Sequence, residues 1–144
     1  MTLDTGALIA LEALATRAVD NRTAHRLAQV LARPTTDPST RVRATAPAVV
    51  IAEWWRGQRG PAAGLLDRRR IEVQPVTREI AERAGQVLAA IGRKSRAARE
   101  GLLLVDAIVV LTAAERGDVV YTSDVADLEQ VRDAGNFQVK ILGI

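Results

Sequence analysis

The 144-residue sequence contains no cysteine and only one histidine, His25. The lack of cysteine excludes disulfides, thiolate nucleophiles and cysteine-ligated zinc, and it fits a reducing compartment. With one histidine, the chain can build neither a ribonuclease that cleaves through paired imidazoles nor a two-histidine zinc motif. The stretch after Met1 shows no signal-peptide pattern, so we expect a cytoplasmic protein.

Aromatic residues and long apolar runs are also scarce. Aromatics make up 3% of a chain that is 48% hydrophobic, so its core must consist mainly of Leu, Val, Ile and Ala. The longest apolar run, 102–111, is much shorter than the roughly 20 residues of a membrane-spanning helix, and we expect no membrane partner. The length is typical of one domain, and we expect a single domain over residues 1–144.

Positive charge is in slight excess, with a net charge of +3, and arginine supplies most of it. Basic clusters are compatible with a phosphate backbone as partner, although an acidic protein or an acidic membrane surface also fits. Solvated loops and helix ends remain the simpler explanation for any single cluster. The clusters are Arg41 and Arg43, Arg68 to Arg70, and Arg93 with Lys94, Arg96 and Arg99.

Predicted strands alternate with predicted helices along the chain. We expect strands over 1–4, 70–76, 118–123 and 137–142. The residues at 33–40 are typical of a loop, those at 92–101 form a basic connection, and a short helix follows Pro61. Strands separated by helices imply right-handed crossovers, and therefore an α/β fold with a central parallel sheet. The other expected helices cover about 5–16, 20–32, 47–56, 77–91, 102–115 and 125–134.

Two acids directly follow predicted strands. Asp4 ends the first strand and Asp124 follows the strand over 118–123. In a parallel sheet, sites form beyond the carboxyl ends of the strands. Taken alone, helix capping is the simpler explanation of each acid, and Asp124 with Asp127 resembles a capping box.

Two further acids lie within apolar helices, where capping does not explain them. Glu53 stands inside "PAVVIAEWW" and Asp106 inside "GLLLVDAIVVL", and we expect both in mid-helix. Arg56 leaves a surface ion pair open for Glu53, but no Lys or Arg stands three or four positions from Asp106. A buried carboxyl bonded to a hydroxyl or a backbone amide is the structural explanation of Asp106.

A cation would explain all four acids together. Carboxylates that converge on one cleft repel one another unless a cation neutralises them. Oxygen ligands without cysteine favour Mg²⁺ or Mn²⁺ over zinc. A carboxylate-bound metal in a basic protein indicates a phosphodiester substrate, which metal-activated water can hydrolyse.

Four segments carry a resemblance to a known family: "LDTGALIAL", "PAVVIAEWWRG", "VDAIVVLTAAERGDVVYTSDVADL" and "VKILGI". In this order and spacing, the chain resembles PIN-domain ribonucleases over essentially its whole length, especially the VapC-type toxins of type II toxin–antitoxin systems. The resemblance implies a three-layer α/β/α fold around a parallel sheet. It also implies a magnesium-dependent endoribonuclease that acts on RNA, forms a homodimer and is held inactive by a cognate antitoxin.

The resemblance also assigns site residues. The family's four acids match Asp4, Glu53, Asp106 and Asp124, and a further acid of less constant role matches Asp127. Two hydroxyl positions of the family match Thr5, directly after the first acid, and Thr122, which opens the pattern T-x-D-x-x-D.

The chain departs from the family's pattern at three positions. Gly6 stands where Ser or Asn is more usual, so a polar contact is expected to be missing. Trp54 and Trp55 are bulkier than the common aliphatic residues, and we expect core or dimer contacts, with at least one of them in the core.

The mechanism implied is in-line hydrolysis of an RNA phosphodiester that leaves a 5′-phosphate. Asp4 and Asp106 would hold the principal Mg²⁺, or Mn²⁺ as its substitute, and Asp124 a second ion or its water. Glu53 would act through metal-bound water, or as a base that does not itself contact the metal.

Two other classes of protein remain to be weighed. A catalytically inactive PIN-like module could bind RNA or protein, although all four acid positions are filled. A phosphotransferase with an aspartyl nucleophile needs a second acid where this chain has Gly6, and no G-x-x-x-x-G-K-[ST] loop is present.

Overall fold

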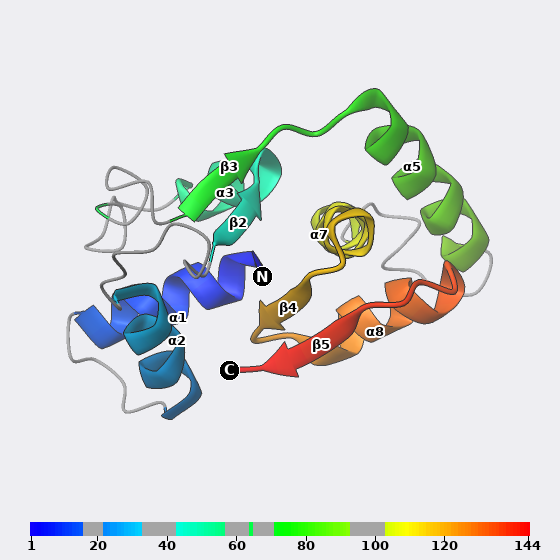
Figure 1. The fold of residues 1–144 in the computed structure, drawn as a ribbon. Helices are drawn as coiled ribbons and strands as arrows, with labels where there is room; N and C mark the ends of the chain where they lie inside the picture. The colour runs from blue at the N-terminus through cyan, green and yellow to red at the C-terminus, as the bar shows by residue number, and fades with distance from the viewer. Residues whose placement is uncertain (16–21, 33–42, 57–63, 65–70, 93–102) are drawn as a thin grey trace.

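The computed structural model describes residues 1–15, 22–32, 43–56, 64, 71–92 and 103–144, which Figure 1 colours along the chain. The loop predicted at 33–40 and nearly all of the connection at 92–101 lie outside the described residues. Of the arginine clusters, only Arg43 is described. The short helix predicted after Pro61 is described at Gly64 alone, and Gly64 is helical.

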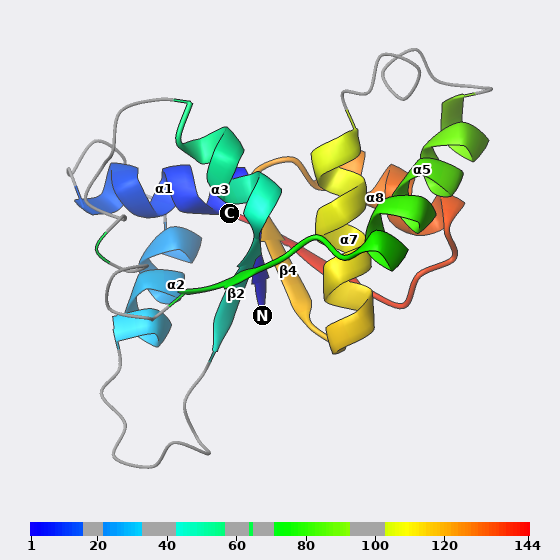
Figure 2. The same ribbon diagram turned by 90° about the horizontal axis from the view of Figure 1, so that it is seen from above.

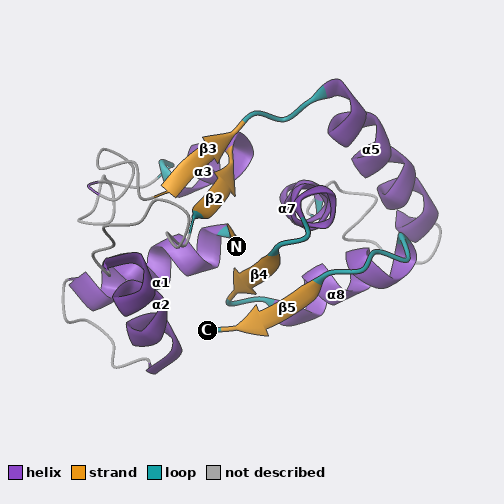
Figure 3. Ribbon diagram, in the orientation of Figure 1, coloured by secondary structure: helices purple, strands orange, loops and turns teal. Residues whose placement is uncertain are grey.

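The described residues form a five-stranded sheet in the order β3-β2-β1-β4-β5, and every neighbouring pair is parallel (Figure 3). The central strand β1 places Thr2 between Thr45 of β2 and Val120 of β4. The predicted α/β fold with a parallel sheet is therefore confirmed. The strands are β1 (Thr2–Leu3), β2 (Ala44–Pro47), β3 (Ile71–Gln74), β4 (Val119–Thr122) and β5 (Lys140–Gly143).

Helices cover both faces of the sheet. Figure 2 shows α1 and α2 on one side of the strands and α5, α7 and α8 on the other, which makes three layers. Helix α3 lies at the end of β2 and contacts both α1 and α7. None of the described helices has the length and apolar character needed to cross a membrane. The described helices are α1 (Thr5–Ala15), α2 (Arg22–Ala32), α3 (Ala48–Trp54), α5 (Arg78–Gly92), α7 (Leu104–Arg116) and α8 (Val125–Ala134).

The apolar run near residue 106 forms the most buried helix. Every residue of α7 from Ala107 to Ala113 is buried, and α7 contacts α3, α5 and α8 as well as β1, β2 and β4. A helix that is apolar on all sides is stable only when it is enclosed in this way. Trp54 joins the core at 7% exposure, whereas Trp55 is 42% exposed, so the core role predicted for one of the two is confirmed.

The prediction around Pro47 was wrong. We expected Pro47 in the first turn of a helix, but it is the last residue of β2 and precedes α3. The strand "ATAP" was missed because Ala and Pro are poor strand formers, and burial between β1 and β3 overrides this propensity. Helix α3 ends at Trp54 rather than Arg56, since Trp55 and Arg56 form a turn.

The mid-helix positions expected for two acids were also wrong. Helix α7 begins at Leu104, so Asp106 lies in its first turn, where the helix dipole favours a negative charge. Glu53 is the penultimate residue of α3, not its middle. The capping role of Thr77 is confirmed, because its hydroxyl accepts a hydrogen bond from the N–H of Ile80 (3.2 Å).

Candidate active site

The order in which strands are added to the sheet reverses between β1 and β4. The chain runs from β1 outward to β2 and β3, then returns to the other side of β1 for β4 and β5. Asp4 directly follows β1, and Asp124 follows β4 after one intervening residue. Both acids therefore lie at the edge of the sheet that the carboxyl ends of the parallel strands form. The Asp4 N–H donates to the Tyr121 carbonyl (3.1 Å). A crevice at such a reversal is the general binding position of parallel α/β sheets.

Asp4 is almost completely buried, at 6% exposure, and both of its carboxylate oxygens accept hydrogen bonds. Oδ1 accepts from the Thr5 N–H (2.6 Å) and Oδ2 from the Thr122 hydroxyl (2.7 Å). Burial raises the pKa of Asp4, and the charge of Glu53 raises it further. Hydrogen bonds from Thr122, Thr5 and Gly6 oppose the shift, but the pKa stays above its ordinary value.

Thr5 connects Asp4 to Glu53. Its backbone N–H binds Asp4, while its hydroxyl donates to Glu53 Oε2 (2.6 Å). Thr5 is the first residue of α1 and Glu53 lies near the end of α3, and these two helices are in contact. The packing of α1 on α3 therefore brings an acid 49 positions away to the end of β1.

Thr122 connects Asp4 to Asp124. Its buried hydroxyl donates to Asp4 and accepts a hydrogen bond from the Asp124 N–H (2.9 Å). Asp124 precedes α8, and its Oδ1 accepts from the Asp127 N–H (3.4 Å). Asp124 thus has the helix-capping role expected for it, and it also lies at the carboxyl end of β4.

The carboxyl of Asp106 has a pKa raised into the neutral range. Burial raises the pKa of its carboxyl to about 7, and the charges of Asp4, Asp127, Asp124 and Glu53 contribute to the shift in that order. The five predicted acids therefore lie in one electrostatic field. A proton or a cation lowers the free energy of such a group of like charges.

The side chains have the chemistry of a hard-cation site. All five acids offer carboxylate oxygens, the donors preferred by Mg²⁺ and Mn²⁺. The pKa of Asp127 is raised by burial and by the charge of Asp124, as expected for carboxylates that share a site. Among the described residues, no three acid or imidazole groups are arranged so that together they could hold a metal ion.

Sequence reasoning missed a contact between Gly6 and Ser123. The glycine was interpreted as the loss of a polar contact. In the structure, a Cβ atom on residue 6 would overlap the hydroxyl oxygen of Ser123, so this serine occupies the space of the absent side chain. Only the packing of α1 against the β4–α8 connection reveals this contact.

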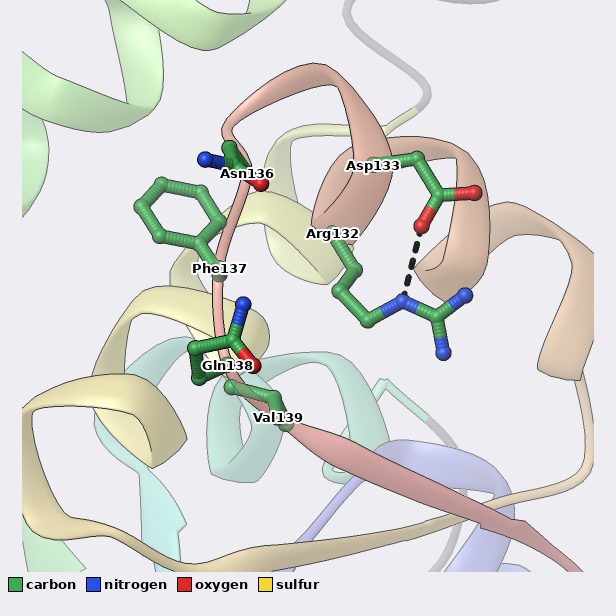
Figure 4. Close-up of a pocket in the computed structure, with 6 residues that line it drawn as sticks. All are labelled: Arg132, Asp133, Asn136, Phe137, Gln138 and Val139. Atoms are coloured by element: carbon green, nitrogen blue, oxygen red, sulfur yellow. Dashed lines mark hydrogen bonds and ion pairs between the residues drawn. The ribbon is translucent and has the colours of Figure 1, made fainter.

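Elsewhere, described residues line two hollows, and none of the predicted acids lines either one. The larger hollow, about 300 Å³, adjoins the amino end of β5, at the opposite edge of the sheet from Asp4 (Figure 4). Its Arg132 already donates to Asp133 Oδ1 (2.8 Å). The smaller, about 200 Å³, is lined by Met1, Thr23, Arg26, Leu27, Val30, Tyr121 and Leu142.

Comparison of the chain with models of protein families gives no match. A search among curated proteins finds no significantly similar sequence.

Proposed function

We propose that the protein is a metal-dependent endoribonuclease of the PIN-domain type, the toxin of a toxin–antitoxin pair. The observation that carries this proposal is the environment of Asp106. Burial, and after it the charges of four other carboxylates, raise its pKa to about 7 at the point where the strand order of the parallel sheet reverses. A cation is the partner that allows such a group to ionise together.

By the family resemblance, Asp4, Asp106 and Asp124 would hold Mg²⁺ or Mn²⁺. Because no three acids of the described residues are arranged as metal ligands, these side chains would have to draw together around the ion. When bound, the ion would polarise the phosphate and lower the pKa of an attacking water. The hydroxyls of Thr122 and Thr5 orient Asp4 and Glu53 through single short hydrogen bonds. Glu53 is the candidate acceptor of the proton that the water loses.

The substrate and partners follow from charge and from the family resemblance. The chain carries a net charge of +3 although five of its acids lie close together around Asp106, and an excess of positive charge favours a phosphate backbone as partner. The resemblance adds a cytoplasmic homodimer and a cognate antitoxin to the proposal.

The test is cleavage of a synthetic single-stranded RNA by the purified protein. We expect Mg²⁺-dependent cleavage that leaves 5′-phosphates, loss of cleavage in EDTA, and at least about a thousandfold loss in Asp106→Asn. Glu72→Gln, an exposed carboxylate on β3, is the matched control and should cleave normally. Full activity of a folded Asp106→Asn protein would refute the proposal.

An inactive PIN-like binding module is the second candidate. It is favoured by the internal hydrogen bonds of Asp4, Glu53 and Asp124, which can serve the fold alone. Such a module would bind RNA equally well in EDTA and in Mg²⁺ and would leave it intact.

A further inference from the structure

Gly6 and Ser123 share one space at the edge of the acidic site. Gly6 is the second residue of α1, and Ser123 connects β4 to α8. A Cβ atom on residue 6 would overlap the Ser123 hydroxyl and lie 2.9 Å from its Cβ and 3.0 Å from its backbone nitrogen. The serine side chain can occupy this position only because residue 6 has no Cβ atom.

The neighbours of Ser123 belong to the acidic site on both sides. Thr122 binds Asp4 through its hydroxyl, and Asp124 is one of the acids around Asp106. The serine packs against Gly6, and the N–H of Gly6 is hydrogen-bonded to the Asp4 carboxylate. Ser123 thus stands between two residues of the acidic site and in contact with a third residue, Gly6, that binds Asp4.

The chemistry of this position favours a donor. Ionised carboxylates only accept hydrogen bonds, so they cannot bind a phosphate oxygen directly. The hydroxyls of Thr5 and Thr122 already donate to Glu53 and Asp4. Ser123 is exposed to solvent and presents a neutral hydroxyl that can donate to a ligand.

We propose that Ser123 is a substrate-positioning residue, whose hydroxyl stands in the space left by Gly6 and donates a hydrogen bond to a phosphate oxygen of bound RNA. Position 6 cannot supply this hydroxyl itself, and Ser123 supplies it from the neighbouring strand end. The choice of RNA rests on the proposed function, but the role of Ser123 is measurable as binding without cleavage.

The experiment measures the affinity of a fluorescein-labelled single-stranded RNA by anisotropy, with Ca²⁺ in place of Mg²⁺ and the RNA checked for integrity. Ser123→Ala should bind about five- to tenfold more weakly than wild type, as expected for one lost hydrogen bond. Two double variants separate the hydroxyl from the packing. G6S/S123G restores a hydroxyl from the other side of the contact, and G6A/S123G fills the same space without it.

These two double variants differ by one oxygen atom. We expect G6S/S123G to bind within about twofold of wild type and G6A/S123G to bind like Ser123→Ala. Thermal unfolding and Mn²⁺ affinity should be equal in the two variants. Gly6→Ala alone should unfold at a lower temperature, since its Cβ overlaps the serine, and the double variants keep the test independent of that loss.

Equal RNA affinity in the two double variants, an unchanged affinity in Ser123→Ala, or no RNA binding by the wild type would each overturn the inference. Failure of the proposed function looks different: the wild type would bind RNA through Ser123 and leave it uncut in Mg²⁺.

Discussion

At the scale of the residue, Asp106 shows why an acid interrupts an apolar stretch. The residues after it, Ala107 to Ala113, are buried and fix α7 against the sheet and its neighbouring helices. The carboxyl in the first turn is thereby held toward the acids that follow β1 and β4. Rigid support of this kind is what metal coordination requires of its ligands.

The raised pKa of Asp106 has a consequence for stability. Because the pKa is about 7 in the folded chain and 3.8 ordinarily, unfolding releases a proton between these values. The stability that this group contributes is fully present below about pH 4 and is lost as the pH rises toward 7. In EDTA at pH 8, Asp106→Asn should therefore raise the free energy of unfolding, by about 1–3 kcal/mol after screening of a partly exposed group.

Urea denaturation at pH 5 and pH 8 measures this effect. The gain from Asp106→Asn should be larger at pH 8, and Glu72→Gln on the exposed face of β3 should show no such difference. A destabilised Asp106→Asn protein at pH 8 would mean that the carboxylate is favourably solvated or paired.

The hydroxyl of Thr122 hydrogen-bonds to both Asp4 and Asp124. Thr122→Val keeps the shape but leaves Asp4 Oδ2 without its donor and the Asp124 N–H without its acceptor. We expect about 1–3 kcal/mol of lost stability, and an Mn²⁺ affinity reduced by about tenfold or more.

Thr45→Val is the matched control for this substitution. Thr45 is equally buried, and its hydroxyl donates to the Met1 carbonyl (3.2 Å) at the opposite edge of the sheet. It should lose stability and keep its Mn²⁺ affinity. Equal Mn²⁺ affinities in the two variants would show that Thr122 serves the fold alone.

At the scale of the element, most helices and four strands could be predicted from the sequence. The strand over 70–76 and the helix capped by Thr77 were evident because alternation and capping are local properties. Strand β2 was not predictable, because "ATAP" is a strand only through its neighbours β1 and β3.

The candidate site was predictable only in part for the same physical reason. Asp4 and Asp124 follow strands, and strand ends of a parallel sheet share an edge. The bond between Thr5 and Glu53 depends on the packing of α1 against α3. The contact of Gly6 with Ser123 likewise depends on where two distant segments meet, which no local pattern encodes.

The end of α7 offers a prediction at this scale. Gly117 terminates the helix with a φ of 65°, in the left-handed region where a Cβ atom is unfavourable. Gly117→Ala should cost about 1 kcal/mol. Gly85→Ala, inside α5 with open space around it, should instead stabilise by about 0.5–1 kcal/mol. Thermal unfolding compares the two, and equal shifts would contradict the assigned helix end.

At the scale of the whole molecule, the carboxyl pKa values shift in opposite directions at the two ends of the parallel strands. Asp118, before β4, is partly buried, which raises its pKa, but hydrogen bonds from the Met1 amino group, Arg116 and Thr2 outweigh this and lower it. At the other edge, burial and neighbouring carboxylates raise the pKa values of Asp4, Asp106 and Asp127. One edge carries its own cations, and at the other edge our proposal places a bound metal ion.

Calorimetric titration of Mn²⁺ into the metal-free protein tests this central claim most directly. At pH 6, in two buffers of different ionisation enthalpy, we expect binding with release of about one proton, because the ion displaces the proton of Asp106. Asp4→Asn and Asp106→Asn should each weaken binding by about tenfold or more, and Glu72→Gln should bind as wild type does. No binding by the wild type, or the same binding in Asp106→Asn, would contradict the account.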